Sequence, residues 1–534
     1  MSAMQTDKRR LHDRFQINVK AMLYQRMPTN GNDGLSVTAI DVSIDGNMTC
    51  LGQVNESLPI GTEVLISFLG PKQEELYKAK IISLGSGGPQ NRIGLKVAQE
   101  GIETMRLLAM NAPKVDRRKE ERRQPANPAE KDRDRQFDRR GFWSGLKSKR
   151  GASERVWKAK NFDMYFYMKP LQSGTGAHVI VDGHEMIMMS SNNYLGLSIH
   201  PKVKEAAIEA IKKYGSSPSA SSLLGGTLDI HIQLEEELAK FKGVEATCVF
   251  SSGYVTNMTT LTTLLGKGDA VFNDNTNHAS LIDGSRLSGA EFRIYNHCDT
   301  EDLEKKLKNS KPANKLVATD SVFSMDGDIA PLPEIFRLCK KYNAGLMVDE
   351  AHATGVFGNT GRGLLEHYGM EGKVDILMGT LSKSLSGTGG FIGGSRELIR
   401  ILKHSARAFV FSAYLPPSIC AAVMTCLKLI DEEPERRINL WRNTEKMRAG
   451  LQGLGFNTGN SQSPIIPIIF PTEEQTNVMT RELRTQGIYV SPVLYPGVKR
   501  NATRVRLTVM ATHSDEDIEK ALHVFNRLKW VLAI

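Results

Sequence analysis

A single lysine lies in a stretch of small residues whose composition suits covalent chemistry with a carbonyl group. Lys383 is flanked by serine, threonine and glycine residues in the stretch 379–390, which follows the apolar run Asp375–Met378. A buried strand that ends in this way can deliver an amine into a cleft, because glycine lets the backbone approach a ligand closely. A desolvated lysine loses its proton readily and becomes a nucleophile suited to a Schiff base. The stretch alone leaves a second interpretation open, a surface loop with a solvated lysine.

Three further polar groups follow apolar runs elsewhere in the chain. Asp349 comes directly after the run Gly345–Val348, and a buried carboxylate needs a cation such as a protonated pyridine nitrogen. The segment Ser252–Tyr254 leads from a predicted strand into a predicted helix, whose first amides can hold a phosphate. His278 lies at the next junction of this kind. Each has an ordinary structural explanation as a cap, a turn or a core residue, but together they supply the components of a pyridoxal phosphate site.

The elements that must position these groups form an α/β pattern. From about Tyr165, short apolar runs alternate with amphipathic segments, which predicts a mostly parallel sheet covered by helices, with ligands at the carboxyl ends of its strands. After about residue 397, helices, strand-like runs and a helix capped by Ser514 indicate a smaller α+β domain. We expect a large domain with an N-terminal arm over residues 161–396 and a C-terminal domain over residues 397–534. The predicted strands of the large domain are Cys248–Ser251, Ala270–Phe272, Phe292–Tyr295, Leu316–Thr319, Gly345–Val348, Ile376–Gly379 and Phe391–Gly393.

From about Phe162 to the C-terminus, the chain resembles the α-oxoamine synthases, a family of fold-type I pyridoxal phosphate (PLP) enzymes. The family includes 8-amino-7-oxononanoate synthase, glycine C-acetyltransferase, 5-aminolevulinate synthase and serine palmitoyltransferase. The resemblance rests on short motifs in the family's order along nearly the whole catalytic unit. These motifs are Asn192–Leu197, Gly226–His231, Ser252–Tyr254, His278–Ser280, Val322–Asp328, Asp349–His352, Thr380–Lys383, Phe411–Pro417 and Arg506–Thr508 with His513. Segments 361–363 and 411–417 are closest to the bacterial members that resemble serine palmitoyltransferase.

The resemblance implies a role for each motif residue. Lys383 would form the Schiff base with PLP and later take the substrate α-proton, and Asp349 would keep the pyridine nitrogen protonated. His278 would stack on the ring and belong, with His352, to the catalytic set. The remaining implied contacts are Ser252, Gly253, Tyr254, Thr380 and a second subunit's Ser412 to the phosphate, His352 and Ser324 to the ring hydroxyl, Arg506 to the substrate carboxylate, and Asn192 in the substrate pocket.

The implied reaction condenses a small amino acid with an acyl-CoA or acyl-carrier-protein thioester in a homodimer. It releases carbon dioxide and the thiol and gives an α-amino ketone. Three positions depart from the family's usual pattern, Asn193, Ser222 and Ala413, and they leave the substrate contacts open. Two alternatives remain, which are another fold-type I activity such as an aminotransferase and a non-catalytic PLP-fold scaffold.

Residues 8–112 carry a different pattern, in which short β-like runs alternate with glycine-rich turns. This pattern predicts a small β-barrel or sandwich. Arg10 and Arg14 precede the first run, and Asp41, Ser43 and Gly46 follow a later one. Arginines can fork onto phosphates and stack on purines, while an acid and a hydroxyl can bind a base edge. The two motifs together resemble those of PilZ domains, and the resemblance implies cyclic di-GMP as a regulatory ligand.

Residues 113–160 predict a basic linker, because mixed charges and two prolines leave little apolar surface to bury. Arg118 and Arg122 repeat the arginine spacing, but no D-x-S-x-x-G motif follows closely. The segment Phe142–Arg150 could contact an anionic membrane, although docking on the next domain is the favoured interpretation. The whole chain is therefore predicted to be multidomain, a PilZ-like β-barrel followed by an α/β fold-type I PLP-dependent transferase.

The charge, apolar content and cysteines of the chain limit the kinds of binding partner that we expect. The 534 residues carry a formal net charge of +10, but the basic residues concentrate in the first 150 positions, so we do not infer nucleic-acid binding. The start of the chain has no apolar signal region and no run could cross a bilayer, so we expect a cytoplasmic protein. Six scattered cysteines favour free buried thiols over disulfides or a metal site.

Overall fold

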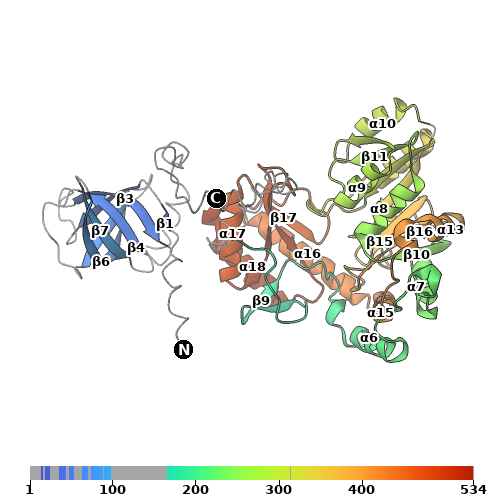
Figure 1. Cartoon of the computed structure of the whole chain (residues 1–534), viewed down its shortest axis with the longest axis horizontal. Helices are drawn as coiled ribbons and strands as arrows, with labels where there is room; N and C mark the ends of the chain where they lie inside the picture. Colours follow the sequence, from blue (N-terminus) through green and yellow to red (C-terminus); the bar gives the residue numbers. More distant parts are fainter. Residues whose placement is uncertain are drawn as a thin grey trace, which may run out of the picture. The chain divides into compact units, whose positions relative to one another are not determined.

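The protein is described from a computed structural model (Figure 1). The structure describes the backbone of seven strands between Arg14 and Val97, and residues 165–532 except residue 313. The chain divides into two compact units, Met1–Asp163 and Met164–Ile534.

The strands of the first unit are all antiparallel, and their pairings close into a ring. The ring runs β3-β2-β5-β6-β7-β4 and returns to β3, and β1 adds to β3 so that Arg14 lies opposite Ser43 in the backbone register. Arg10 and Gly46 lie outside the described residues, and for Arg14, Asp41 and Ser43 only the backbone is described. The strands are β1 (Arg14–Phe15), β2 (Val19–Tyr24), β3 (Leu35–Ser43), β4 (Asn47–Gly52), β5 (Glu63–Leu69), β6 (Glu74–Gly87) and β7 (Gln90–Val97).

The second unit contains the predicted large sheet. Its seven strands have the order β10-β16-β15-β14-β13-β11-β12, and β16 runs antiparallel to both of its neighbours. The predicted mostly parallel sheet is therefore confirmed, with one reversed strand. The strands are β10 (Ala246–Phe250), β11 (Ala270–Asp274), β12 (Glu291–Tyr295), β13 (Lys315–Asp320), β14 (Gly345–Asp349), β15 (Ile376–Thr380) and β16 (Gly390–Gly394).

Helices cover this sheet, so its central strands are buried at all or nearly all of their positions. All five residues of β11 and of β15 are buried, which explains why both appear in the sequence as continuous apolar runs. The helices of the large domain are α6 (Pro201–Tyr214), α7 (Asp229–Lys242), α8 (Gly253–Leu264), α9 (Ala279–Leu287), α10 (Thr300–Lys308), α11 (Leu332–Lys341), α12 (Leu364–His367), α13 (Arg396–Ser405), α14 (Arg407–Val410) and α15 (Pro417–Glu432). Helices α13–α15 lie at or beyond the expected boundary at residue 396, because their buried side chains belong to the same apolar cluster as the sheet.

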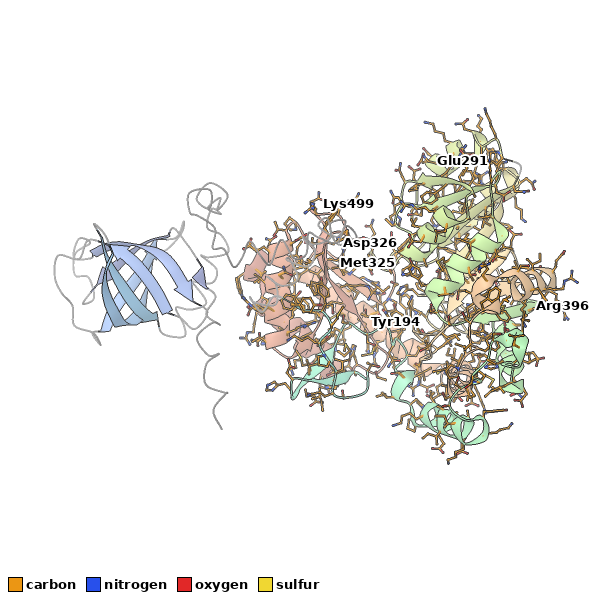
Figure 2. All side chains as sticks on the ribbon, viewed as in Figure 1. Tyr194, Glu291, Met325, Asp326, Arg396 and Lys499 are labelled. Carbon is orange, nitrogen blue, oxygen red and sulfur yellow. The ribbon has the colours of Figure 1, made fainter. Side chains whose placement is uncertain are left out.

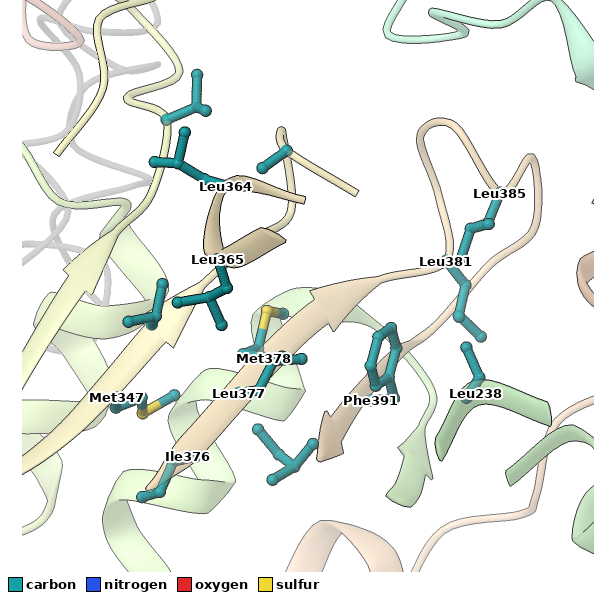
Figure 3. Close-up of a cluster of buried hydrophobic side chains, with 14 of the residues drawn as sticks. Leu238, Met347, Leu364, Leu365, Ile376, Leu377, Met378, Leu381, Leu385 and Phe391 are labelled. Atoms are coloured by element: carbon teal, nitrogen blue, oxygen red, sulfur yellow. The ribbon is translucent and has the colours of Figure 1, made fainter. Parts of the chain in front are cut away.

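Two leucines fix the loop that follows β15. Leu381 and Leu385 are both fully buried, and Figure 3 shows Leu381 directed toward Leu238 of α7. They stand two residues before and two residues after Lys383. The predicted glycine-rich lysine stretch is therefore a loop whose apolar residues are anchored in the core while its lysine is presented on the other side.

The C-terminal domain has its own core and two small sheets. One sheet has the order β17-β20-β19, and the other has the order β18-β9-β8. The cap predicted at Ser514 is confirmed as a capping box, in which Ser514 and Asp517 each bind the other's backbone N–H. The elements are β8 (His178–Val181), β9 (His184–Met188), α16 (Glu435–Gly453), β17 (Ile465–Phe470), α17 (Glu473–Thr485), β18 (Ile488–Tyr489), β19 (Ser491–Val493), β20 (Thr503–Thr508) and α18 (Asp515–Arg527).

The N-terminal arm joins the C-terminal domain. β9 pairs with β18 in parallel register, Ile187 opposite Ile488, and Figure 1 shows β9 beside α18. Ile187 and Met189 belong to the same buried apolar cluster as strands β17 and β20. Two segments some 300 positions apart in the sequence thus fold as one body.

Among the described residues, no helix is long and apolar enough to cross a membrane. The five cysteines in this part of the chain are all free thiols, and four of them are buried, as expected; Cys298 is half-buried. Cys50 lies in β4, where only the backbone is described.

Candidate active site

The carboxyl ends of β13, β14 and β15 and the starts of α8 and α9 surround a cavity of about 230 Å³. Nine of the residues predicted for the site lie around it. They are Ser252, Gly253, Tyr254, His278, Ser324, Asp349, His352, Thr380 and Lys383. The sheet therefore gathers side chains that are up to 131 positions apart in the sequence (Lys383 − Ser252).

Lys383 presents the amine of this cavity. It follows β15 by three residues, and burial among the cavity walls lowers the pKa of its ammonium group from 10.5 to about 8. The carboxylates of Asp349 and Asp320 act in the opposite direction, and the Arg506 guanidinium acts in the same direction as burial. The ammonium still predominates near neutral pH, but the uncharged fraction that can attack a carbonyl group is far larger than in an ordinary lysine.

Asp349 is the buried carboxylate at the end of β14. Its Oδ2 accepts a hydrogen bond from Asn257 Nδ2 at 2.7 Å, and its Oδ1 accepts one from the Ala351 backbone at 2.8 Å. Both donors hold the carboxylate in place while it lines the cavity. A fixed buried carboxylate of this kind suits a cationic ring nitrogen.

His278 caps α9 and presents its ring to the cavity. Its backbone N–H donates to Asp320 Oδ2 at 2.7 Å, and its Nδ1 lies 2.7 Å from Ser280 Oγ. The ring meets Tyr254 edge to face, with centroids 6.1 Å apart. The imidazole is therefore fixed from its backbone, its Nδ1 and its edge, and the rest of it faces the cavity.

His352 lies on the opposite wall with Tyr194. The Tyr194 hydroxyl is 2.6 Å from His352 Nδ1. Burial lowers the pKa of His352 well below 6.5, and the positive charges of Lys383 and Arg506 add to this effect. Burial also raises the pKa of Tyr194 to about 12. Both groups are therefore neutral at physiological pH and share one hydrogen bond.

The start of α8 forms a cradle lined by small groups. Ser252 is the N-cap, and its Oγ accepts from the Val255 backbone at 3.2 Å. A Cβ on Gly253 would come within 2.9 Å of Thr380 Oγ1, and a Cβ on Gly390 would come within 2.8 Å of Gly253 Cα. Only glycine lets these three segments approach so closely. The free amides at the helix start can receive a phosphate.

Arg506 reaches the site from β20 of the C-terminal domain. Its guanidinium donates to the Ser324 carbonyl at 2.5 Å, to Thr508 Oγ1 at 2.9 Å and to Asn192 Oδ1 at 3.2 Å. All three acceptors are uncharged, and no ion pair of Arg506 occurs within residues 165–532. Arg506 and Asn192 are thus brought together as predicted, with the positive charge of the guanidinium unneutralised.

A second arginine of β20 fastens the same loop. Arg504 Nη1 donates to Asp326 Oδ1 at 2.6 Å and to the Met325 carbonyl at 3.0 Å. Figure 2 shows Met325 and Asp326 where the large domain meets the C-terminal domain. Residues two apart on a strand face the same side, so β20 holds the loop that carries Ser324 with both of its arginines.

Three predicted residues, Asn192, Ser412 and Arg506, are not part of the cavity lining, and the three departures from the family pattern have structural partners. Ser222 Oγ donates to the Phe409 carbonyl at 3.2 Å, and Asn193 Nδ2 binds Ser198 Oγ and the Thr175 carbonyl. Ala413 forms a backbone bridge with Ser221. Each of the three therefore stabilises a local turn or bridge.

Three functional positions were not predicted from the sequence. Asp320 lines the cavity and holds the His278 backbone, while Asn257 and Ser280 form the hydrogen bonds behind His278 and Asp349. Burial raises the pKa of Asp320 well above its ordinary value, and the charge of Asp349 adds to this effect. The sequence contained one feature that could have identified Asp320: it ends strand β13, just as Asp349 ends the neighbouring strand β14.

The donors and the shape of the cavity fit pyridoxal phosphate. The fit rests on a desolvated amine, a fixed carboxylate, a flat ring on one wall and a glycine cradle at a helix start. Fold-type I enzymes use this set of groups for that cofactor.

Comparison with known proteins agrees with this assignment. Residues 184–525 match the family model of aminotransferase class I and II. The chain is 44% identical to the 8-amino-7-oxononanoate synthase of Thermoanaerobacter pseudethanolicus over 377 residues, which span 70% of this chain and 95% of that protein. It is 42% identical to the serine palmitoyltransferase of Sphingobacterium spiritivorum over 377 residues, 70% of this chain and 94% of that protein.

Solved structures give the same result. A high-resolution structure of SPT with a PLP internal aldimine superposes with a TM-score of 0.71 at 32% identity, covering 74% of this chain and all of that one. The serine palmitoyltransferase of Sphingomonas wittichii superposes with a TM-score of 0.71 at 34% identity, covering 73% of this chain and 99% of that one. The chain therefore belongs to the aminotransferase class I and II family and, within it, to the pyridoxal-phosphate-dependent acyltransferases of the α-oxoamine synthase group.

Proposed function

We propose that the enzyme condenses a small amino acid with an acyl-CoA or acyl-carrier-protein thioester, with loss of carbon dioxide, to give an α-amino ketone. The observation that carries this proposal is that Lys383 lines the cavity while Arg506 binds the carbonyl of Ser324 in the cavity wall and acts electrostatically on Lys383. The first offers an amine whose pKa is lowered to about 8, and the second offers a guanidinium without a carboxylate partner among the described residues. An amine with a carboxylate-binding cation opposite it suits an amino-acid substrate.

Bound PLP supplies a positively charged ring that withdraws electrons from the substrate's α-carbon. Lys383 holds the cofactor and then accepts the α-proton. Asp349 keeps the ring nitrogen protonated, and His278 packs against the ring face. The remaining cofactor contacts are the Ser252 hydroxyl, the Gly253 and Tyr254 amides and Thr380 at the phosphate, with Ser324 and His352 at the ring hydroxyl.

Arg506 orients the substrate by binding its carboxylate in a two-pronged hydrogen bond, and Asn192 lines the same pocket. The Asn192 carbonyl oxygen already accepts from Arg506, so it holds the guanidinium plane in the orientation that presents its edge to the pocket. Because the three neutral acceptors fix this plane, little rotational entropy is lost when the carboxylate binds.

The test is a matrix of amino acids (serine, glycine, alanine) against acyl-CoA and acyl-carrier-protein donors, read by mass spectrometry. We expect carbon dioxide, free thiol and an α-amino ketone from one combination. The family model's name also points to a transaminase. Transfer of the amino group to an oxoacid, with no carbon dioxide or thiol released, would establish that alternative instead.

We propose that the active unit is a homodimer in which the partner subunit's Ser412 completes the phosphate contacts. The exposed apolar side chains near that segment support this proposal. Phe411 is 74% exposed and Leu224 is 84% exposed, and a second copy would remove both from water. Light scattering of the full chain should give twice the mass of one chain, and a monomer with full activity would disprove the dimer.

We further propose that the first unit is a PilZ domain that binds cyclic di-GMP in the cytoplasm and regulates the enzyme. The arginine motif Arg10–Arg14 and the Asp41, Ser43 and Gly46 motif support this, as does the β1–β3 pairing that sets Arg14 opposite Ser43 in the backbone. Calorimetric titration of the full chain should detect cyclic di-GMP binding, and Arg14→Ala should abolish it. Binding that survives Arg14→Ala would place the ligand elsewhere.

A further inference from the structure

In the cavity wall, a chain of buried hydrogen bonds connects His278 to Asp349. Ser280 Oγ lies 2.7 Å from His278 Nδ1, and Asn257 Nδ2 lies 2.9 Å from Ser280 Oγ and 2.7 Å from Asp349 Oδ2. Ser280 and Asn257 are almost completely buried, at 0% and 1% exposure. The chain therefore runs from α9 through α8 to the end of β14 without solvent.

The direction of each hydrogen bond follows from which group can only accept. A carboxylate oxygen of Asp349 accepts, so the amide nitrogen of Asn257 faces it, because the reversed amide would set two oxygens together. The second N–H of the amide then donates to Ser280 Oγ. With its oxygen accepting, the Ser280 hydroxyl is free to donate to His278 Nδ1.

The oxygen of the Asn257 side chain does not contribute to this orientation. Oδ1 is buried and has no hydrogen-bond partner within the described residues. The amide is therefore held in place by its two N–H groups.

A second donor reaches the same nitrogen of the histidine. The Ser280 backbone N–H points at His278 Nδ1 at 3.3 Å, and a backbone N–H can only donate. His278 Nδ1 therefore receives two donors and carries no proton of its own. The neutral imidazole then keeps its single proton on Nε2.

We infer that Ser280 and Asn257 are positioning residues that hold His278 as the neutral Nε2–H tautomer and join it to Asp349. This inference rests on the proposed function, because the ring face of His278 has a role only if it packs against bound PLP. A neutral imidazole packs against a protonated pyridine ring, whereas an imidazolium would repel it. The same hydrogen bonds that orient Asp349 thus keep the charge of His278 at zero.

The surroundings of His278 favour the same state. Burial lowers the pKa of the imidazole and the Lys383 ammonium lowers it further, while the Asp349 carboxylate raises it. The titratable groups facing or contacting the histidine from the packed elements are Tyr254, Asp320, Asp349, His352 and Lys383.

The test is nuclear magnetic resonance of the full chain labelled with ¹³C and ¹⁵N in histidine, recorded with and without PLP. His278→Gln assigns the signal. We expect the Nε2–H tautomer at pH 7 and a protonation midpoint below 6.5. A His278 that is charged at pH 7, or that carries its proton on Nδ1, would overturn the inference.

Ser280→Ala removes one donor to Nδ1 and leaves the backbone donor. The midpoint of His278 should then rise by about one pH unit, since one hydrogen bond is worth about 1 kcal/mol. Ser285→Ala is the matched control, because Ser285 is buried on the same helix and binds Asn273 without contact to His278. An unchanged midpoint in Ser280→Ala would overturn the inference.

A second variant covers the case in which Ser280→Ala does not fold. Asn257→Ala frees the Ser280 hydroxyl to accept as well as donate, so the midpoint should shift in the same direction by a smaller amount. If the full chain gains no PLP absorbance that Lys383→Ala removes, the proposed function fails. The tautomer measured without cofactor is independent of that result.

Discussion

At the scale of single residues, the amine of Lys383 makes the activity dependent on pH. Its pKa is lowered to about 8 by burial, so the uncharged form grows as pH rises through that value and is complete above it. We predict that the rate of PLP uptake by cofactor-free protein rises with pH up to about 8 to 9 and then levels off. Stopped-flow absorbance measures this rate. A rate that still climbs up to pH 10.5 would indicate an ordinary solvated lysine.

Arg506 gives a second prediction at this scale. Replacing it by methionine removes the cation proposed to bind the substrate carboxylate, and a hydrogen bond to a charged group is worth about 1.5–3 kcal/mol. The KM for the amino acid should rise roughly 10- to 100-fold, with a smaller effect on the KM for the thioester. Arg337→Met is the control, because Arg337 forms an exposed pair with Glu334 far from the cavity. Equal rises in both KM values would disprove the carboxylate role.

The sequence predicted the site residues that belong to a recognisable motif, and it did not predict the residues that only hold those residues in place. Lys383, Asp349 and His278 each lie at or just after the end of a strand, and their motifs taken together indicated the site. Asp320, Asn257 and Ser280 could not be recognised in this way, because their role exists only once β13, β14, α8 and α9 are side by side. Hydrogen-bond partners of this kind depend on register and helix rotation, which a local pattern does not specify.

At the scale of elements, a buried ion pair joins α7 to the loop after β14. Lys242 Nζ lies 2.6 Å from Glu350 Oε2, with 1% and 0% of the two side chains exposed, and Glu350 Oε1 accepts from the Leu365 backbone. We predict that Lys242→Met destabilises the protein by about 3–5 kcal/mol, because it leaves a buried carboxylate without a cation. Urea unfolding measures the change.

The control for this prediction is an exposed pair. Lys446 binds Asp515 and Glu519 on the surface, and Lys446→Met should change stability by less than about 1 kcal/mol. Lys242→Met combined with Glu350→Leu should recover part of the loss, since no unpaired charge remains. A single Lys242→Met variant as stable as Lys446→Met would refute the argument.

The arginines of β20 give another prediction for an element. Asp326 lies on the loop that carries Ser324, and its carboxylate is the charged partner of the 4% exposed Arg504. Asp326→Asn keeps the size and one acceptor but removes the charge. We expect a loss of about 1–2 kcal/mol in stability and a higher KM for the amino acid, because β20 also carries Arg506. If the free energy of unfolding falls while the KM for the amino acid is unchanged, the Asp326–Arg504 pair has a structural role only.

The sequence predicted where the strands lie better than it predicted which strands pair with one another. All seven strands of the large sheet were found within three residues of their ends. Burial helped, because the completely buried strands β11 and β15 appear as continuous apolar runs. The arm was assigned to the large domain, whereas β9 pairs with β18 of the C-terminal domain. That pairing spans some 300 positions, and no local pattern distinguishes a strand's partner at such a distance.

At the scale of the whole molecule, the relatives that match this chain correspond to its second compact unit. The 8-amino-7-oxononanoate synthase of Thermoanaerobacter pseudethanolicus aligns over 95% of its own length while covering 70% of this chain, so a protein without the first unit can still be a complete synthase. Residues Met164–Ile534 also form their own body of contacts. The second unit therefore contains all the elements that its relatives use.

We predict that a chain shortened to residues 161–534 folds, binds PLP and retains turnover, because its cores are complete without the first unit. Cyclic di-GMP should change the rate of the full chain and leave the shortened chain unaffected. Steady-state rates with and without the dinucleotide measure both effects, and Arg14→Ala in the full chain is the matched control. A response in the shortened chain would move the regulatory site to the catalytic unit. If the shortened chain no longer binds PLP, the first unit is required for the fold of the second unit, in addition to any regulatory role.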